Sequence, residues 1–197
     1  MSIRERKKEK TRSTIIDCAY NLFKGKGFQE TSMEEIAEQS DVSKGTLYNY
    51  FPDKESILVG YFQSFTADYG EDIKEAITDS QDLEVKLNNL LDFEKGLMGS
   101  DVKLTAIYLR YRMQTLFSSD PFSNPNRSGL ENVVLEIIKD AQAKKELRSD
   151  IPSIIIARTF MLLAVNYFIS NIEANEPFEM DTLKNQLIEL FLNGAKL

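Results

Sequence analysis

Apolar residues recur at helical spacing along almost the whole chain. The first set with i, i+3, i+4 spacing consists of Ile15, Cys18, Ala19, Leu22 and Phe23. This set predicts a helix over about 8–25, and Gly25 and Gly27 mark its end. Because no segment alternates apolar and polar residues as a half-buried strand does, the pattern predicts an all-α chain.

Two short helices joined by a tight turn are predicted next. Ser32 with Glu35 has the spacing of a capping box, as has Thr31 with Glu34, so "TSMEEIAEQ" is expected to hold the first short helix. The residues "SDVS" form the connection, and Ser43 is the expected N-cap of the second helix. A helix, a tight turn and a second helix form the arrangement that places its second helix in a DNA major groove.

The second short helix, over 44–51, has two faces. Val42, Leu47 and Phe51 are apolar and spaced to pack on the preceding helix. Gly45 lies in the first turn, where the absence of a side chain lets a partner approach the backbone. The positions left largely outside the core face are Lys44, Thr46, Tyr48, Asn49 and Tyr50.

A long helix over about 54–78 follows, with Asp53 as its N-cap because Pro52 cannot continue the preceding helix. Its length indicates a connector into a second domain. Five more helices are predicted at about 82–98, 102–117, 128–147, 152–174 and 181–193. We therefore expect about nine helices, with a helix-turn-helix head over 1–53 and a helical body over 54–197.

Charge is distributed unevenly along the chain. The net charge is −7, yet residues 1–60 hold ten basic and ten acidic groups. The first twelve residues hold six basic and two acidic groups. A basic arm on a neutral head, followed by an acidic body, indicates a localised contact with a polyanion.

The composition also excludes several kinds of chemistry. The chain has no histidine, which removes the commonest general base and metal ligand. It also has no metal-ligand cluster and no glycine-rich phosphate loop, so we expect no enzyme activity, no metal and no cofactor. Cys18 is the single cysteine and is expected to be a buried structural thiol, with a redox sensor as the alternative.

No membrane segment is expected. The most apolar run, 154–169, contains Arg158 and is shorter than the roughly 20 residues that a membrane span needs. The charged N-terminus has no apolar stretch of the kind found in signal peptides. These features indicate a cytoplasmic protein.

The segment "TSMEEIAEQSDVSKGTLYNYFPDKESIL" resembles the DNA-binding signature of the TetR family of bacterial repressors, over about residues 10–60. Asp41 stands where that family usually has glycine, and Tyr50 where it often has histidine. The resemblance implies phosphate contacts from Thr31, Ser32, Tyr48, Tyr50 and Lys54. It implies base contacts from Lys44, Gly45, Thr46 and Asn49. It also implies a homodimer on a nearly palindromic double-stranded DNA operator.

For the body, the resemblance implies an effector pocket and dimerisation through the last two helices. The sequence supports the dimer separately, because the helix over 152–174 is apolar nearly all round and a small domain cannot easily cover it. A fully internal core helix is the alternative. Candidate effector-binding residues are Tyr108, Tyr111, Arg112, Phe117, Asn166 and Tyr167. Arg112 with Tyr108 could clamp an anionic group of a lipophilic ligand, or the arginine could lie at the surface and pair with acids.

The sequence thus predicts a repressor that releases its operator when a small lipophilic or amphipathic molecule binds the body. A helical carrier of lipophilic ligands without operator function is one alternative, and an activator of the same family is another. The exposed polar face around Lys44, Tyr48 and Asn49 argues against the carrier.

Overall fold

The computed structural model describes residues 2–68, 82–99, 101–115, 130–173 and 179–195. Within these ranges the chain forms helices and no strand, which confirms the predicted all-α fold. The helices are α1 (Ile3–Lys26), α2 (Met33–Gln39), α3 (Lys44–Tyr50), α4 (Lys54–Asp68), α6 (Leu83–Gly99), α7 (Val102–Thr115), α8 (Leu130–Ala143), α9 (Ser153–Glu173) and α10 (Met180–Ala195).

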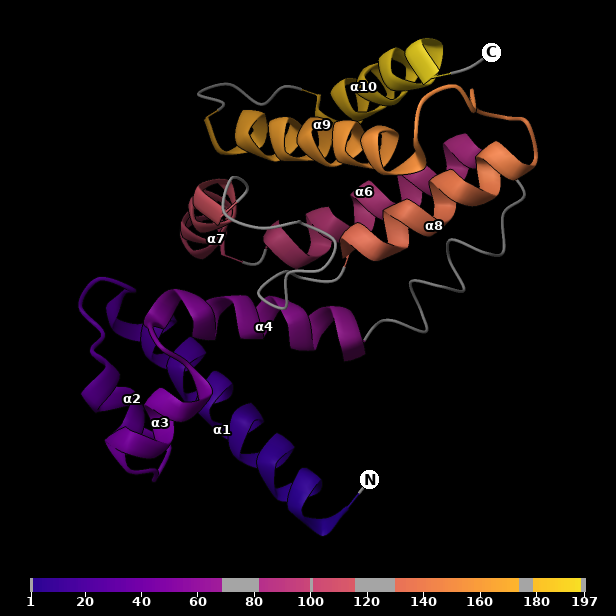
Figure 1. Cartoon of the computed structure of the whole chain (residues 1–197). Helices are drawn as coiled ribbons and strands as arrows, with labels where there is room; N and C mark the ends of the chain where they lie inside the picture. Colours follow the sequence, from indigo (N-terminus) through magenta and orange to yellow (C-terminus); the bar gives the residue numbers. More distant parts are fainter. Residues whose placement is uncertain (1, 69–81, 100, 116–129, 174–178, 196–197) are drawn as a thin grey trace.

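The helices are arranged in a head and a body with α4 between them (Figure 1). In the head, α1 packs on α2 and α4, and α2 packs on α3. In the body, α6 contacts α7, α8 and α10, while α9 contacts α7, α8 and α10. Helix α4 contacts both α1 and α7, so it is the element through which the two parts meet.

Helix α1 begins earlier than the sequence pattern predicted. Ser2 and Glu5 form a capping box, in which the Ser2 hydroxyl accepts from the Glu5 N–H at 3.2 Å and the Glu5 carboxylate accepts from the Ser2 N–H at 2.6 Å. The apolar periodicity starts only at Ile15, because the preceding turns are exposed and need no apolar face. The basic arm is therefore part of a capped helix that projects from the head (Figure 1).

Helices α1 and α4 cross closely at Gly60. A Cβ at this position would lie 3.0 Å from the Phe51 ring and 3.2 Å from Ile16 Cδ1. Arg12 lies in the same contact, with its guanidinium 5.4 Å from the centre of the Phe51 ring and an Nη2–Oε1 hydrogen bond of 2.9 Å to Gln63. One turn along, the rings of Tyr20 and Tyr61 stack with centres 4.0 Å apart. The crossing ties α1, the end of α3 and α4 into one unit.

The turn between α2 and α3 explains the aspartate at position 41. Asp41 has a φ of 53°, which places it in the left-handed region where glycine is the default residue. Aspartate is among the few other residues that tolerate this region. Its exposed side chain adds no core contact, so the position constrains the backbone only.

Replacing Asp41 by glycine should therefore stabilise the head. We expect the free energy of unfolding to rise by about 0.5 kcal/mol, since glycine removes the left-handed strain but adds freedom to the unfolded chain. Thermal unfolding of Asp41→Gly, with Asp41→Val as the opposite control, checks this. A lower unfolding temperature for the glycine variant than for the valine variant would contradict the account of the turn.

Polar contacts fix the body helices at their edges. Lys184 Nζ lies 2.7 Å from Asp92 Oδ1 and joins α10 to α6. Gln142, at the end of α8, donates to the carbonyls of Arg148 and Ile151 at 2.6 and 2.9 Å and accepts from Ser153, at the start of α9. The Gln142 contacts join the end of α8 to the start of α9.

The body helices agree with the predicted ranges to within a few residues, and α4 is described only as far as Asp68. The rest of the predicted 54–78 helix lies outside the described residues. Helix α9 is the one described helix with the length and composition to cross a membrane, over Ser153–Ser170. It packs on α7, α8 and α10, as a core helix of a folded body also does.

Candidate functional site

The short helix α3 is held by its ends and its inner face. The Ser43 hydroxyl accepts from the Thr46 N–H at 3.1 Å, which confirms Ser43 as the N-cap. Leu47 and Phe51 are buried and anchor the helix on the rest of the head. Tyr48 is 49% exposed, and Asn49 is exposed beside it. The outer face of α3 therefore carries polar side chains that the core does not use.

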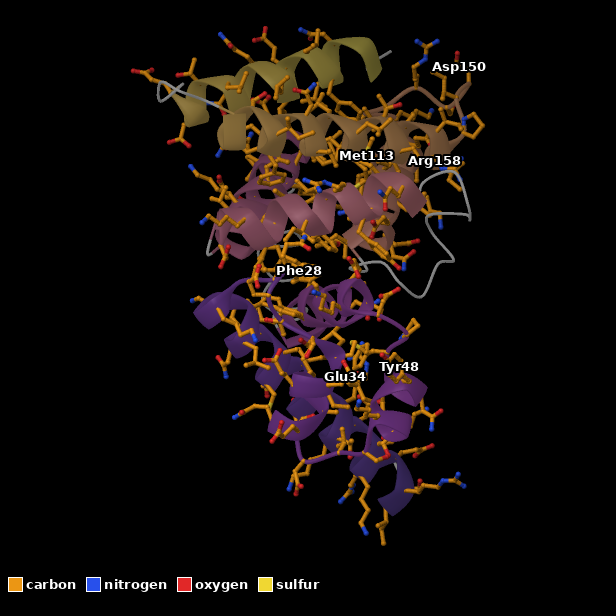
Figure 2. All side chains as sticks on the ribbon, turned by 90° about the vertical axis from the view of Figure 1, so that its left-hand side faces the viewer. Phe28, Glu34, Tyr48, Met113, Asp150 and Arg158 are labelled. Atoms are coloured by element: carbon orange, nitrogen blue, oxygen red, sulfur yellow. The ribbon has the colours of Figure 1, made fainter. Side chains whose placement is uncertain are left out.

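The basic residue on this face already has an anionic neighbour. Lys44 Nζ lies 3.1 Å from Glu34 Oε1 on α2, and both side chains are largely exposed. The backbone N–H of Glu34, with Lys44, lowers the pKa of the Glu34 carboxyl. Because exposed pairs are worth at most about 1 kcal/mol, a phosphate or a base edge can replace Glu34 as the partner of Lys44. Figure 2 shows Glu34 and Tyr48 together in the head.

Gly45 has no structural reason to be glycine. A Cβ placed there would meet only the Ser43 hydroxyl, at 3.9 Å, and otherwise open space. Glycine in a helix costs up to about 1 kcal/mol relative to alanine. The missing side chain therefore leaves room for a partner molecule to approach the backbone of α3.

Thr31 and Ser32 were both expected to bind phosphate, and the structure corrects this for Thr31. The Thr31 side chain is only 2% exposed, and its hydroxyl donates to the Gly27 carbonyl at 2.8 Å. Ser32 is the N-cap of α2 and forms the predicted capping box with Glu35. The sequence allows two capping boxes one residue apart, Thr31 with Glu34 and Ser32 with Glu35. The structure has the second, and with Ser32 as the N-cap the Thr31 side chain is buried.

Glu35 is held in its charged form by the same cap. The Lys26 ammonium and the N–H and hydroxyl of Ser32 lower the pKa of Glu35 to about 2. The contribution of this group to stability is present above its ordinary value of 4.5 and is lost as the pH falls through about 2.

Lys54 has a structural role that the sequence did not predict. Its ammonium donates to the carbonyls of Phe28, Gln29 and Thr31 at 2.8, 3.3 and 2.7 Å, and it lies 4.8 Å from the centre of the Phe28 ring. An ammonium has three donors, so these carbonyls account for all of them. Lys54 therefore fastens the α1–α2 loop to the start of α4, and a phosphate contact would require it to release a carbonyl.

Replacing Lys54 by methionine should weaken the head in the absence of DNA. We expect a loss of about 2 kcal/mol in the free energy of unfolding, because charge-assisted hydrogen bonds to three carbonyls disappear. Lys44→Met is the matched control, since its exposed pair contributes less than about 1 kcal/mol. Denaturant unfolding of both variants checks this, and equal stabilities would contradict the role assigned to Lys54.

Thr46 and Tyr50 lie at the edge of the exposed face. Both are half-buried, and Thr46 Oγ1 shares a hydrogen bond of 2.8 Å with the Ser43 hydroxyl. Tyr50 packs partly against the core. The exposed part of the predicted interface thus centres on Lys44, Gly45, Tyr48 and Asn49.

Cys18 is half-buried in the contact between α1 and α2. Its thiol donates to the Gln39 carbonyl with an Sγ–O distance of 3.4 Å. Burial, with a smaller effect of Asp17, raises the pKa of this thiol. A raised pKa lowers the fraction of reactive thiolate, which favours the structural interpretation over the redox sensor.

In the body, the predicted pair of Tyr108 and Arg112 is found on the inner face of α7. Both side chains are buried, and the Arg112 guanidinium lies 5.5 Å from the centre of the Tyr108 ring. Arg112 forms an ion pair with Glu131 of α8, which is only 2% exposed. The alternative that Arg112 lies at the surface is therefore wrong, although the arginine does pair with an acid.

The other predicted effector residues are scattered. Tyr167 of α9 is fully buried, and among the described residues its hydroxyl has no hydrogen-bond partner. Asn166 is exposed, so it points away from the interior and is better placed for an interface. Tyr111 is half-buried, and burial, with Asp53 and Glu55, raises the pKa of its hydroxyl. Asp53 and Glu55 lie at the start of α4, so Tyr111 lies on the side of α7 that faces this helix. Phe117 lies outside the described residues.

An apolar surface runs along the outer side of α9 and α10. Its large exposed side chains are Ile155, Leu162, Ile169 and, 68% exposed, Leu190. The three α9 residues are seven apart and so share one face. A groove of about 320 Å³ lies on this side, with Leu163, Leu190 and Phe191 in its walls. Among the described residues no helix packs over these exposed side chains, and a dimer contact through α9 and α10 stays a prediction.

Comparison with known proteins relates the head to a family of regulators. A sequence model described as "Bacterial regulatory proteins, tetR family" matches residues 15–60. The chain is 23% identical to a "Fatty acid metabolism regulator protein" of Bacillus subtilis over 181 residues, which cover 91% of this chain and 93% of that protein.

Solved structures give the same architecture. Thermus thermophilus FadR, a TetR-family transcriptional repressor in complex with lauroyl-CoA, is 24% identical with a TM-score of 0.75, covering 94% of this chain and 95% of that one. FadR from Bacillus subtilis in complex with stearoyl-CoA is 21% identical with a TM-score of 0.67, covering 93% and 98%.

The family match covers the second half of α1, all of α2 and α3 and the start of α4, the helices that build and support the exposed α3 surface. The similarity to the FadR fold extends over 94% of this chain, so it includes the body as well as the head. Among the described residues, no group of three His, Cys, Asp or Glu side chains is placed to hold a metal ion. Residues 15–60 therefore form a DNA-binding domain of the kind found in the tetR family of bacterial regulatory proteins, and the chain is a DNA-binding transcriptional regulator.

Proposed function

We propose that this regulator is a homodimeric cytoplasmic repressor that releases a palindromic operator when a long-chain acyl-CoA binds its body. The observation that carries the DNA-binding part is the outer face of α3, where Gly45 leaves the backbone open beside Lys44, Tyr48 and Asn49. The acyl-CoA is inferred from the ligands in the two FadR complexes and from the fatty acid metabolism regulator of similar length.

In this proposal the α3 helix enters the major groove of each half-site. Lys44, Gly45, Thr46 and Asn49 face the bases, while Tyr48 and Tyr50 bind phosphates with Ser32 at the start of α2. The exposed basic residues of the α1 arm add contacts to phosphates that weaken as the salt concentration rises.

The dimer is proposed to form through α9 and α10. The exposed apolar residues on these helices would be covered by the same residues of a second copy, as in a symmetric interface. Pairing at this end of the body sets the distance between the two heads, because α4 joins each head to its body.

Helix α4 is proposed as the linking element, with the head over 1–53 and the body from 54 onward. Gly60 and Tyr61 tie α4 to α1, while Phe62, with its ring stacked at 4.1 Å on Tyr108, ties it to α7. A ligand that favours one position of α7 over another thereby favours one spacing of the heads. The ligand acts through its different affinities for the two arrangements.

Fluorescence anisotropy tests the proposed effector. Lauroyl-CoA and stearoyl-CoA are titrated into the complex of the protein with an operator obtained by selection from random DNA, at fixed salt. We expect both to release the operator, and free coenzyme A to leave the complex intact. Release by neither acyl-CoA would reject the proposed effector class.

A further inference from the structure

Arg112 and Glu131 form a buried ion pair in the body. Arg112 is 4% exposed and Glu131 is 2% exposed, and they join α7 to α8. The other buried residues of these two helices are mostly apolar, among them Leu104, Tyr108, Leu109, Val134, Ile137 and Ile138. Burial of two charges takes both out of water, and their attraction often does no more than offset that loss.

Stability alone therefore gives little reason for this pair. Apolar side chains of similar volume at the two positions often hold a core as well or better. A buried arginine can, however, offer a planar, permanently charged fork to an anionic group, which an apolar residue cannot. The position of the pair supports such a use, because it lies inside the part of the chain where the effector is expected.

The pair is also connected to the head by direct contacts. The Arg112 guanidinium lies over the Tyr108 ring, and Tyr108 stacks on Phe62 of α4 with ring centres 4.1 Å apart at 28°. Phe62 packs edge-on against Tyr61, at 5.5 Å. Tyr61 in turn stacks on Tyr20 of α1 at 4.0 Å, so packed rings run from the ion pair to the head.

We propose that Arg112 anchors the anionic group of the effector, and that Glu131 is the internal anion that this group displaces. The inference rests on the proposed function and adds the residue that recognises the charge. The group is a phosphate or a carboxylate, since both offer oxygen pairs to a guanidinium. Glu131 lies in the first turn of α8. In this proposal that turn moves outward and carries the displaced carboxylate to solvent.

The exchange accounts for a response in the head. Arg112 keeps a counter-charge throughout, so no unpaired charge stays buried. The guanidinium turns toward the ligand, and Tyr108 moves with it against Phe62. Helix α4 then shifts relative to α7, and the stacked Tyr61 and Tyr20 rings carry the shift into α1.

Two variants separate this switch from a plain structural pair. Glu131→Gln removes the competing anion, so about tenfold less ligand should release the operator. Arg112→Met with Glu131→Leu removes the anchor together with its internal anion. Operator affinity of this double variant in the absence of ligand is measured first and should match the wild type, and release should then need at least about tenfold more ligand.

The probes are lauroyl-CoA, laurate and the uncharged dodecanol, titrated into the operator complex of each protein. Loss of sensitivity to lauroyl-CoA alone identifies a phosphate as the bound group, and loss of sensitivity to laurate identifies a carboxylate. Dodecanol should act equally on the wild type and the double variant. If the double variant does not fold, Glu131→Gln alone tests the anchor. The concentrations of lauroyl-CoA, laurate and dodecanol that release the operator from Glu131→Gln are then compared with those for the wild type.

The possible failures can be told apart. If no probe releases the operator from the wild-type protein, the proposed function falls, and this inference falls with it. If lauroyl-CoA or laurate releases the wild type and acts at the same concentrations on Glu131→Gln and on the double variant, only the Arg112 anchor is overturned.

Discussion

Replacing Gly45 by alanine should make the protein more stable and its operator binding weaker. Alanine in the first turn of α3 should add about 0.5 to 1 kcal/mol to the free energy of unfolding, because the new methyl group meets no atom closer than 3.9 Å in the free protein. On DNA the same methyl group would occupy the space where the backbone approaches the groove. We expect a loss of about tenfold or more in operator affinity, equivalent to ~1.4 kcal/mol.

Gly25→Ala is the matched control for this result. Gly25 also lies in a helix, α1, and a Cβ there would meet nothing within 4 Å. Its replacement should raise stability and leave operator affinity unchanged. Thermal unfolding and anisotropy at one salt concentration measure both effects. Equal operator affinities for Gly45→Ala and the wild type would contradict the assigned role of α3.

Introducing charge on the α9 surface should separate the dimer. Leu162→Glu with Leu190→Glu places two carboxylates on the exposed apolar face, where the second copy would have to bury them. Two linked heads bind with an avidity about 10² to 10⁴ above that of one head. The monomeric variant should therefore lose at least about 100-fold in operator affinity and keep its helical content.

Val85→Glu is the control for a charge on an exposed apolar position elsewhere, since Val85 is exposed on α6. Analytical ultracentrifugation should show a dimer for this control and a monomer for the α9–α10 variant. A variant that remains dimeric, or a monomer that binds the operator as tightly as the wild type, would refute the proposed interface.

The head could be predicted from the sequence because its signals are local. The Ser43 cap, the Ser32–Glu35 capping box and the exposed face of α3 all follow from residues within one or two turns. The early start of α1 was also readable, since Ser2 and Glu5 have the capping-box spacing. The apolar pattern alone does not indicate this start, because it begins only at Ile15.

The contacts of Lys54 and Arg112 could not be predicted in the same way. A lysine after a helix-turn-helix can reach a phosphate or a backbone carbonyl, and only the path of the α1–α2 loop decides that Lys54 meets three carbonyls. Arg112 and Glu131 are 19 residues apart on different helices. Phe62 lies on α4 and Tyr108 on α7, with the whole of α6 between them in the chain, so the link from body to head exists only in the packed fold.

Selection of binding sites from random double-stranded DNA tests the central claim most directly. The wild-type protein and a Lys44→Ala, Tyr48→Ala variant are each carried through the same rounds at fixed salt. The account predicts that the wild type enriches an inverted repeat whose half-sites are a helical turn or more apart, and that the variant enriches none. Enrichment of no sequence by the wild type, or of the same repeat by the variant, would contradict it.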